Sequence, residues 1–97
     1  MRTIEEWRNS IDAIDGELLC LLNRRAELAL EAGRAKLNAG LPICDGARER
    51  EVIDRSCRIN AGPLDKTAIT NIFRRIIHET RSFEMRRVNE IEEVQKS

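Results

Sequence analysis

The sequence predicts an all-α protein with three helices per chain (long, short and long) that associates as a helical homodimer. Glycine and proline cluster at only two places, residues 38–42 and 60–63, and these divide the chain into three segments. Each segment carries apolar residues at helical spacing, and none shows sustained alternation. The first segment is also too long for one chain of 97 residues to cover its apolar side, which predicts the dimer.

The first helix is expected over residues 3–37. Its apolar positions alternate steps of three and four residues, the heptad pattern of a helix that packs along a seam. These positions are Ile4, Trp7, Ile11, Ile14, Leu18, Leu21, Leu28, Ala32 and Ala35. Such a helix is about 51 Å long, whereas a compact chain of this size has a diameter of roughly 32 Å. We therefore expect the long helices of two chains to share one core.

The second and third helices are each predicted to begin after an aspartate, because aspartate is a good N-cap residue. Asp45 precedes a short helix of about 14 residues that ends near Asn60. Asp65 precedes a long amphipathic helix that ends near Glu93, and residues 94–97 are expected to fray. The stripe of the third helix consists of Ile69, Ile72, Phe73, Ile76, Ile77, Thr80, Phe83, Val88 and Ile91.

Composition and charge exclude several classes of protein. The 17 basic and 17 acidic side chains give a net charge of zero, so we expect no general nucleic-acid binding. No apolar run is long enough for a membrane span, and the N-terminus lacks the apolar stretch of a signal peptide. Cys20, Cys44 and Cys57 form no C-x-x-C pair, so we expect reduced cysteines that fill apolar space, a cytoplasmic protein and no bound metal. His78 has no nearby Cys or Ser partner, which argues against a nucleophilic triad.

Two cations of the first helix are candidate site residues. Arg25 is the one polar residue among the ten seam positions, and a buried guanidinium needs an anion. That anion is either a ligand or a glutamate of another helix, unless Arg25 reaches to solvent. Lys36 follows Arg25 by eleven residues, about 16 Å along the axis and about 20° around it. Both side chains therefore face the same way and can converge on one small anion, although Lys36 is also an ordinary C-terminal helix cation.

Arg8 is placed differently from these two cations. It precedes Arg25 by seventeen residues, about 25 Å along the axis and about 100° around it. Arg8 therefore cannot share a small ligand with Arg25 of the same helix. In an antiparallel dimer the start of one long helix lies near the later part of its partner, so Arg8 can complete the site of the other chain.

Carboxyl groups accompany the cations on the second and third helices. Glu84 falls on the apolar face of the third helix, where it either pairs with a buried arginine or carries a proton because burial raises its pKa. Asp45, Arg48 and Glu49 straddle the start of the second helix, where they border a pocket or simply form a capped helix with surface ion pairs. Together with Arg25 and Lys36, they suggest a pocket for a compact dianion with an apolar body.

Several short runs of the chain occur in a distinctive order. They are residues 11–15, 18–19, 21–25, 31–36, 42–45, 48–51, 62–65 and 72–79. In this order they resemble the all-helical class of chorismate mutases, from Ile4 to about Arg87. The resemblance implies a single domain over residues 1–97 in an intertwined homodimer. It also implies an isomerase of the shikimate pathway without a cofactor or metal, which converts chorismate to prephenate for phenylalanine and tyrosine biosynthesis.

The resemblance implies that the cations bind the substrate's charged groups. Arg25 and Arg8 of the partner subunit would hold the two carboxylates of chorismate. Lys36 would contact a carboxylate and the ether oxygen, and Arg48 would assist on the carboxylate side. These four cations would hold the flexible enolpyruvyl arm over the ring.

The resemblance implies further roles for the polar residues of the second and third helices. Glu49 would bind the ring hydroxyl with help from Asp45, and Thr80 would lie near the ring carboxylate. Glu84 would hydrogen-bond the ether oxygen at a position where many bacterial members carry Gln. A carboxylate cannot donate a hydrogen bond, so Glu84 must be protonated to do this work. Burial raises the pKa of Glu84 and Lys36 lowers it, and the sequence leaves the direction of the net pKa shift open.

Two other functions stay open at this point. A lyase of the same fold that releases pyruvate from isochorismate needs the same cations. A non-catalytic helical module that binds a metabolite or a partner enzyme needs no complete set of site residues. The sequence also leaves open whether the chain acts alone or as one module of a fused enzyme.

Overall fold

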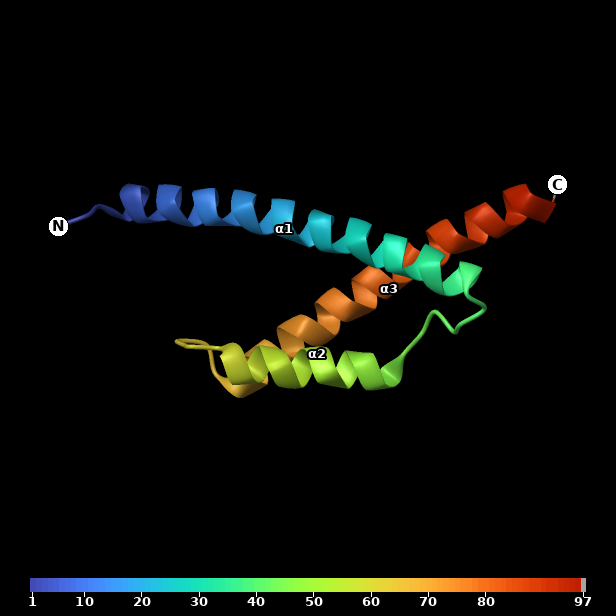
Figure 1. Ribbon diagram of the computed structural model, residues 1–97. Helices are drawn as coiled ribbons and strands as arrows, with labels where there is room; N and C mark the ends of the chain where they lie inside the picture. Colours follow the sequence, from blue (N-terminus) through green and yellow to red (C-terminus); the bar gives the residue numbers. More distant parts are fainter. Residues whose placement is uncertain (97) are drawn as a thin grey trace.

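The computed structural model consists of three helices joined by two short loops (Figure 1). The structure describes residues 1–96, with side chains for all of them except 91–93, 95 and 96. The helices are α1 (Ile4–Asn38), α2 (Gly46–Ile59) and α3 (Lys66–Lys96). The described part of the chain contains no strand, which confirms the all-α prediction. The predicted place of Ile91 in the third stripe lies outside the described side chains.

Both predicted aspartate N-caps are present. Asp45 Oδ1 accepts a hydrogen bond from the Arg48 amide at 3.1 Å, and Asp65 Oδ1 accepts one from the Ala68 amide at 2.8 Å. These bonds satisfy backbone donors that the first turn of a helix cannot pair internally, so they fix where α2 and α3 begin. The positions of Asp45 and Arg48 at the start of α2 follow directly from this cap.

The predicted fraying of the C-terminal tail is wrong for residues 94–96, because α3 continues through Lys96. The segment after Pro63 contains no glycine or proline that would end the helix. Its last residues include Glu, Gln and Lys, which have good helix propensity. Ser97 lies outside the described residues.

Helix α3 holds the chain together, because it contacts both of the other helices. Figure 1 shows α2 running beside the first half of α3, while the C-terminal part of α1 crosses the second half of α3. The contact between α1 and α3 buries Leu30, Gly33 and Val88. This arrangement brings residues from all three helices together near the C-terminal end of α1.

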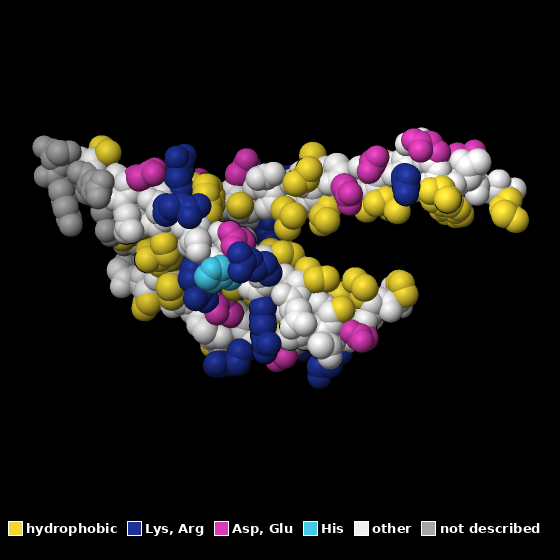
Figure 2. Space-filling model, turned by 180° about the vertical axis from the view of Figure 1, so that it is seen from behind, with side chains coloured by type: hydrophobic (Ala, Val, Ile, Leu, Met, Phe, Trp, Pro, Cys, Tyr) yellow, Lys and Arg dark blue, Asp and Glu magenta, His cyan; other side chains and the backbone are white. Residues whose placement is uncertain are grey.

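The heptad seam of α1 is not covered by the rest of its own chain. Trp7, Ile11 and Leu18 of the seam are 53%, 56% and 48% exposed. Figure 2 shows hydrophobic side chains along the edge of α1 that is turned toward the arm formed by α2 and α3, and along the facing edge of that arm. The radius of gyration of 17.3 Å exceeds the roughly 12.5 Å of a compact chain of this length. The chain by itself therefore leaves its longest apolar surface open, as the length of the helix predicts.

The structure also bears on the expectations for the cysteines and for a membrane span. The expectation that the cysteines fill apolar space is wrong for Cys44, which is exposed, and Cys20 is exposed within the single chain. Cys20 lies in α1, and Cys44 lies in the loop before α2. None of the described helices is long and apolar enough to cross a membrane.

Candidate active site

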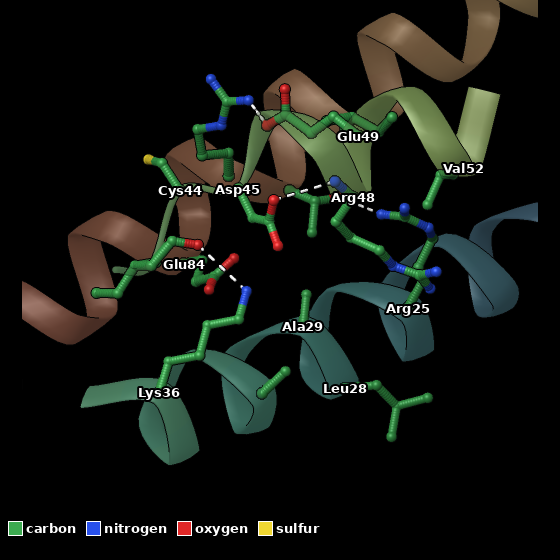
Figure 3. A pocket seen from close by; sticks show the side chains of 15 residues that line it. Arg25, Leu28, Ala29, Lys36, Cys44, Asp45, Arg48, Glu49, Val52 and Glu84 are labelled. Atoms are coloured by element: carbon green, nitrogen blue, oxygen red, sulfur yellow. Dashed lines mark hydrogen bonds and ion pairs between the residues drawn. The ribbon is translucent and has the colours of Figure 1, made fainter. Parts of the chain in front are cut away.

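A cavity of about 320 Å³ lies where the three helices and the loop before α2 meet (Figure 3). This volume is at the lower end of the range of roughly 300–1,000 Å³ that is usual for small-molecule sites. Its lining consists of Arg25, Leu28, Ala29, Ala32, Lys36, Ile43, Cys44, Asp45, Arg48, Glu49, Val52, Ile77, Thr80, Arg81 and Glu84. Seven of the eight site residues predicted from the sequence are in this lining, and Arg8 is the exception.

Arg25 and Arg48 lie together at one end of the cavity (Figure 3). Arg25 Nη1 donates a hydrogen bond to Thr80 Oγ1 at 3.2 Å, and no carboxylate pairs with Arg25 within the described part of the chain. Burial, and then the neighbouring charge of Arg48, lower the pKa of Arg25. Two guanidinium groups so close together repel each other, so this end of the cavity favours an anion.

Lys36 and Glu84 lie at the other end (Figure 3). Lys36 Nζ donates a hydrogen bond to the Ile43 carbonyl oxygen at 3.2 Å. The Glu84 side chain is buried, with 8% exposure, and its Oε1 atom has no hydrogen-bond partner within the described structure. Burial raises the pKa of Glu84, while the charges of Lys36 and Arg81 oppose that rise. The net direction, which the sequence left open, is therefore upward.

A glycine of α1 makes room for the Glu84 side chain. A Cβ atom built on Gly33 would overlap Glu84 Oε1 and would lie 3.0 Å from both Cγ and Cδ of Glu84. Gly33 is itself buried between α1 and α3. The sequence interpretation did not single out this glycine, because a glycine within a helix becomes informative only once its neighbour on another helix is known.

The start of α2 supplies the third side of the cavity. The Asp45 carboxyl group caps the helix through the Arg48 amide, while the Arg48 guanidinium is paired with Glu51 at 2.7 Å on the same helix. Glu49 forms an ion pair with Arg81 of α3. The proposed alternative of a merely capped helix with surface ion pairs therefore describes only part of this segment, because Asp45, Arg48 and Glu49 all line the cavity.

Arg81 is the charged lining residue that the sequence interpretation missed. It lies four residues after Ile77 and three residues before Glu84, so the helical spacing places it on the same face of α3. That spacing was the available signal. Arg81 did not stand out because four other arginines occur in the same helix.

Arg8 does not belong to the cavity of its own chain. It lies near the start of α1, in the part of the helix that extends away from α2 and α3 in Figure 1. His78 is exposed and is not part of the cavity lining. The described side chains include no group of three or more His, Cys, Asp and Glu residues that could hold a metal ion.

Charge is therefore distributed unevenly within the cavity. One end presents two guanidinium groups, and the other presents an ammonium group beside a carboxyl group whose pKa is raised by burial. Apolar side chains, including Ile43, Val52 and Ile77, also line the cavity. The arrangement can bind a small anionic molecule with an apolar body.

Comparison with known protein families agrees with this geometry. Residues 7–85 match the family described as chorismate mutase type II. The chain is also similar to the chorismate mutase (Form II) structure from Thermus thermophilus, with a TM-score of 0.83 and 32% sequence identity. That similarity covers 86% of this chain and 94% of the Thermus chain.

Several curated proteins are similar in sequence. The chain is 41% identical over 88 residues to a bifunctional chorismate mutase/prephenate dehydratase of Aquifex aeolicus, which covers 87% of this chain and 24% of the relative. The corresponding protein of Escherichia coli K12 is 42% identical over 74 residues, 75% of this chain and 19% of the relative. A 4-amino-4-deoxychorismate mutase of Streptomyces venezuelae is 34% identical over 77 residues, 78% of this chain and 75% of the relative. The chain thus spans a quarter or less of the length of the two bifunctional relatives.

Proposed function

The chain belongs to the type II chorismate mutase family, and from this membership we propose that it is an isomerase that converts chorismate to prephenate. We take residues 1–97 as one catalytic domain that acts in the cytoplasm on the route to phenylalanine and tyrosine. The observation that carries the proposal is the cavity in which Arg25 and Arg48 lie at one end and Lys36 and Glu84 at the other.

The reaction is an intramolecular Claisen rearrangement. The ether C–O bond of chorismate breaks while a new C–C bond forms between the enolpyruvyl arm and the ring, and no proton is transferred. The protein therefore has two tasks, to hold the arm over the ring and to stabilise negative charge on the ether oxygen. Both tasks suit a cavity of fixed cations and hydrogen-bond donors.

The cations at one end of the cavity would hold the two carboxylates of the substrate. Arg25 is suited to this role because it is half-buried and no carboxylate pairs with it in the described part of the chain. Thr80 accepts a hydrogen bond from Arg25 and so orients the guanidinium beside the expected position of the ring carboxylate. Arg48 would contribute a second cation after exchanging Glu51 for the substrate.

Arg8 of the partner subunit would complete the carboxylate-binding end. Two observations support this role: Arg8 lies outside the cavity of its own chain, and the seam of α1 is exposed over much of its length. An intertwined homodimer would cover the seam and bring the start of one α1 toward the cavity of the other chain.

Lys36 and Glu84 would act on the ether oxygen. Lys36 supplies a positive charge at this end of the cavity, and burial favours the protonated form of Glu84, which can donate a hydrogen bond. Donors fixed in a cavity before the reaction begins stabilise the charge that develops in the transition state. Glu49, with Asp45 beside it, would accept a hydrogen bond from the ring hydroxyl.

Nuclear magnetic resonance of the reaction products tests the proposal. Purified protein is incubated separately with chorismate and with isochorismate, and the products are assigned. We expect prephenate from chorismate. Release of pyruvate from isochorismate with inert chorismate would instead identify a lyase, and binding of chorismate without conversion would identify a non-catalytic module.

The Streptomyces relative raises a second substrate, 4-amino-4-deoxychorismate, which carries an amine in place of the ring hydroxyl of chorismate. In the proposed binding mode Glu49 faces this group. The surroundings of Glu49 therefore determine which of the two substrates the cavity favours.

A further inference from the structure

Glu49 is held by a contact between helices that the proposed reaction does not by itself require. Its Oε1 atom forms an ion pair with Nη2 of Arg81, and both side chains line the cavity. Among the ion pairs of the described residues, this is the one that joins two helices, because the others connect residues three or four positions apart. The two side chains are only 29% and 38% exposed, so solvent screens their charges less than it screens those of a surface pair.

Arg81 has no other carboxylate ion-pair partner in the described structure. Arg81 also lines a second hollow of about 380 Å³, to which Arg50 and Arg74 contribute. Glu49 is the one acidic residue in the lining of this hollow. The neighbouring cations thus offer Arg81 no alternative partner and favour its position against Glu49.

Arg81 is also not needed to bind the two carboxylates. Arg25, Arg48 and Lys36 already provide cations in the lining, and Arg81 meets the cavity on the side of Glu49. Its charge also acts on Glu84, which serves both substrates alike, but at the ring substituent it acts through its contact with Glu49.

We propose that Arg81 is a specificity-determining residue, which by neutralising Glu49 selects a ring with a neutral hydroxyl and rejects one with an ammonium group at the same position. This inference rests on the proposed function. An unpaired Glu49 carboxylate would attract an ammonium group strongly. With Arg81 against Glu49, an ammonium group within hydrogen-bond distance of that carboxylate also lies close to a guanidinium and is repelled. A hydroxyl group can donate a hydrogen bond to Glu49 without this repulsion.

The test is the specificity ratio, kcat/KM for chorismate divided by kcat/KM for 4-amino-4-deoxychorismate. It is measured for the wild type, for Arg81→Met, which removes the charge at similar length, and for Arg81→Lys, which keeps the charge. The matched control is Arg87→Met, because Arg87 lies on the same helix but pairs with Glu90 outside the cavity. Both rates of each ratio come from one preparation, so a reduced fraction of folded protein cancels.

We expect the wild type to favour chorismate and Arg81→Met to lower the ratio by at least about tenfold, whereas Arg81→Lys stays within about threefold of the wild type. Arg87→Met should leave the ratio unchanged. A ratio for Arg81→Met within about twofold of the wild type, or a wild type that favours the amino substrate, would overturn the inference while leaving chorismate turnover intact.

A second measurement needs no variant. An aliphatic amine loses its charge as the pH rises, so the wild-type ratio should fall as the pH rises through the pKa of the substrate's amine. Effects of pH on groups that serve both substrates cancel in the ratio. A ratio that stays constant over this range would contradict the role of Arg81, even if Arg81→Met did not fold. A wild type that converts neither substrate would refute the proposed function itself.

Discussion

Gly33 of α1 lies directly against the carboxyl group of Glu84 of α3. A Cβ atom at position 33 would overlap Oε1 of Glu84. It would also lie 3.0 Å from both Cδ and Cγ of that side chain. Because Gly33 is buried, Glu84 cannot keep this position if a side chain is added there. The absence of a side chain on one helix thus determines where a protonatable group of another helix sits in the cavity.

Gly33→Ala is expected to reduce kcat by about ten- to a hundredfold, because the displaced Glu84 carboxyl no longer reaches the ether oxygen. Alanine has the higher helix propensity, so loss of helix α1 is not the expected cause. Steady-state kinetics measure the change in kcat, and circular dichroism shows whether the helical content is retained. Adding Glu84→Asp, which shortens the side chain, should recover part of the lost kcat. A single variant with wild-type kcat would refute the positioning role of Gly33.

Arg25→Ala and Lys36→Ala are each expected to lower kcat/KM on the order of 10²- to 10³-fold, because each removes a fixed cation that faces the transition state. Ultraviolet absorbance, which follows the loss of chorismate, gives kcat/KM for each variant. Arg75→Ala is a matched control, since Arg75 is exposed and pairs with Glu79 outside the cavity. Sedimentation should show that all three variants keep the oligomeric state of the wild type. Unchanged rates for Arg25→Ala or Lys36→Ala would remove that residue from the site.

Activity is expected to fall as the pH rises through the raised pKa of Glu84. Burial is the larger cause of this shift, and it favours the protonated form, which alone can donate a hydrogen bond to the ether oxygen. A Gln side chain donates at any pH, so Glu84→Gln should flatten the profile of kcat against pH. Identical profiles for the variant and the wild type would show that Glu84 does not act as a donor.

The same shift links folding stability to pH. Because the pKa of Glu84 is higher in the folded state than in the unfolded state, its favourable contribution is fully present below the unfolded pKa. That contribution is lost as the pH rises through the folded pKa. Urea unfolding at several pH values should therefore show a steeper loss of stability for the wild type than for Glu84→Gln. Parallel curves would contradict the raised pKa.

Much of the fold could be predicted from the sequence because it depends on local chemistry. Asp45 and Asp65 cap helices through bonds to backbone amides three residues away, and such spacing is visible in a single sequence. The burial of Glu84 followed from the spacing of apolar residues along one helix. Their separation of eleven residues, close to three helical turns, placed Arg25 and Lys36 on the same side of α1, and both line the cavity.

The remaining features depend on contacts between helices, which spacing alone does not reveal. The pairing of Arg81 with Glu49 joins α3 to α2, and the close approach of Gly33 to Glu84 joins α1 to α3. The sequence contains other arginines, glutamates and glycines, and nothing in the spacing marks these four as the ones that meet across helices. The persistence of α3 through Lys96 was missed because a frayed terminus is the usual expectation for the end of a chain.

A mixing experiment with two inactive variants shows whether each site combines Arg25 of one chain with Arg8 of its partner. Arg8→Ala and Arg25→Ala are unfolded together in equal amounts and refolded, and chorismate turnover is measured. A shared site leaves one intact cavity in each mixed dimer, so the mixture should recover about a quarter of the wild-type activity. If each cavity used only residues of its own chain, the mixture would be as inactive as the separate variants, and the account of a shared site would be wrong.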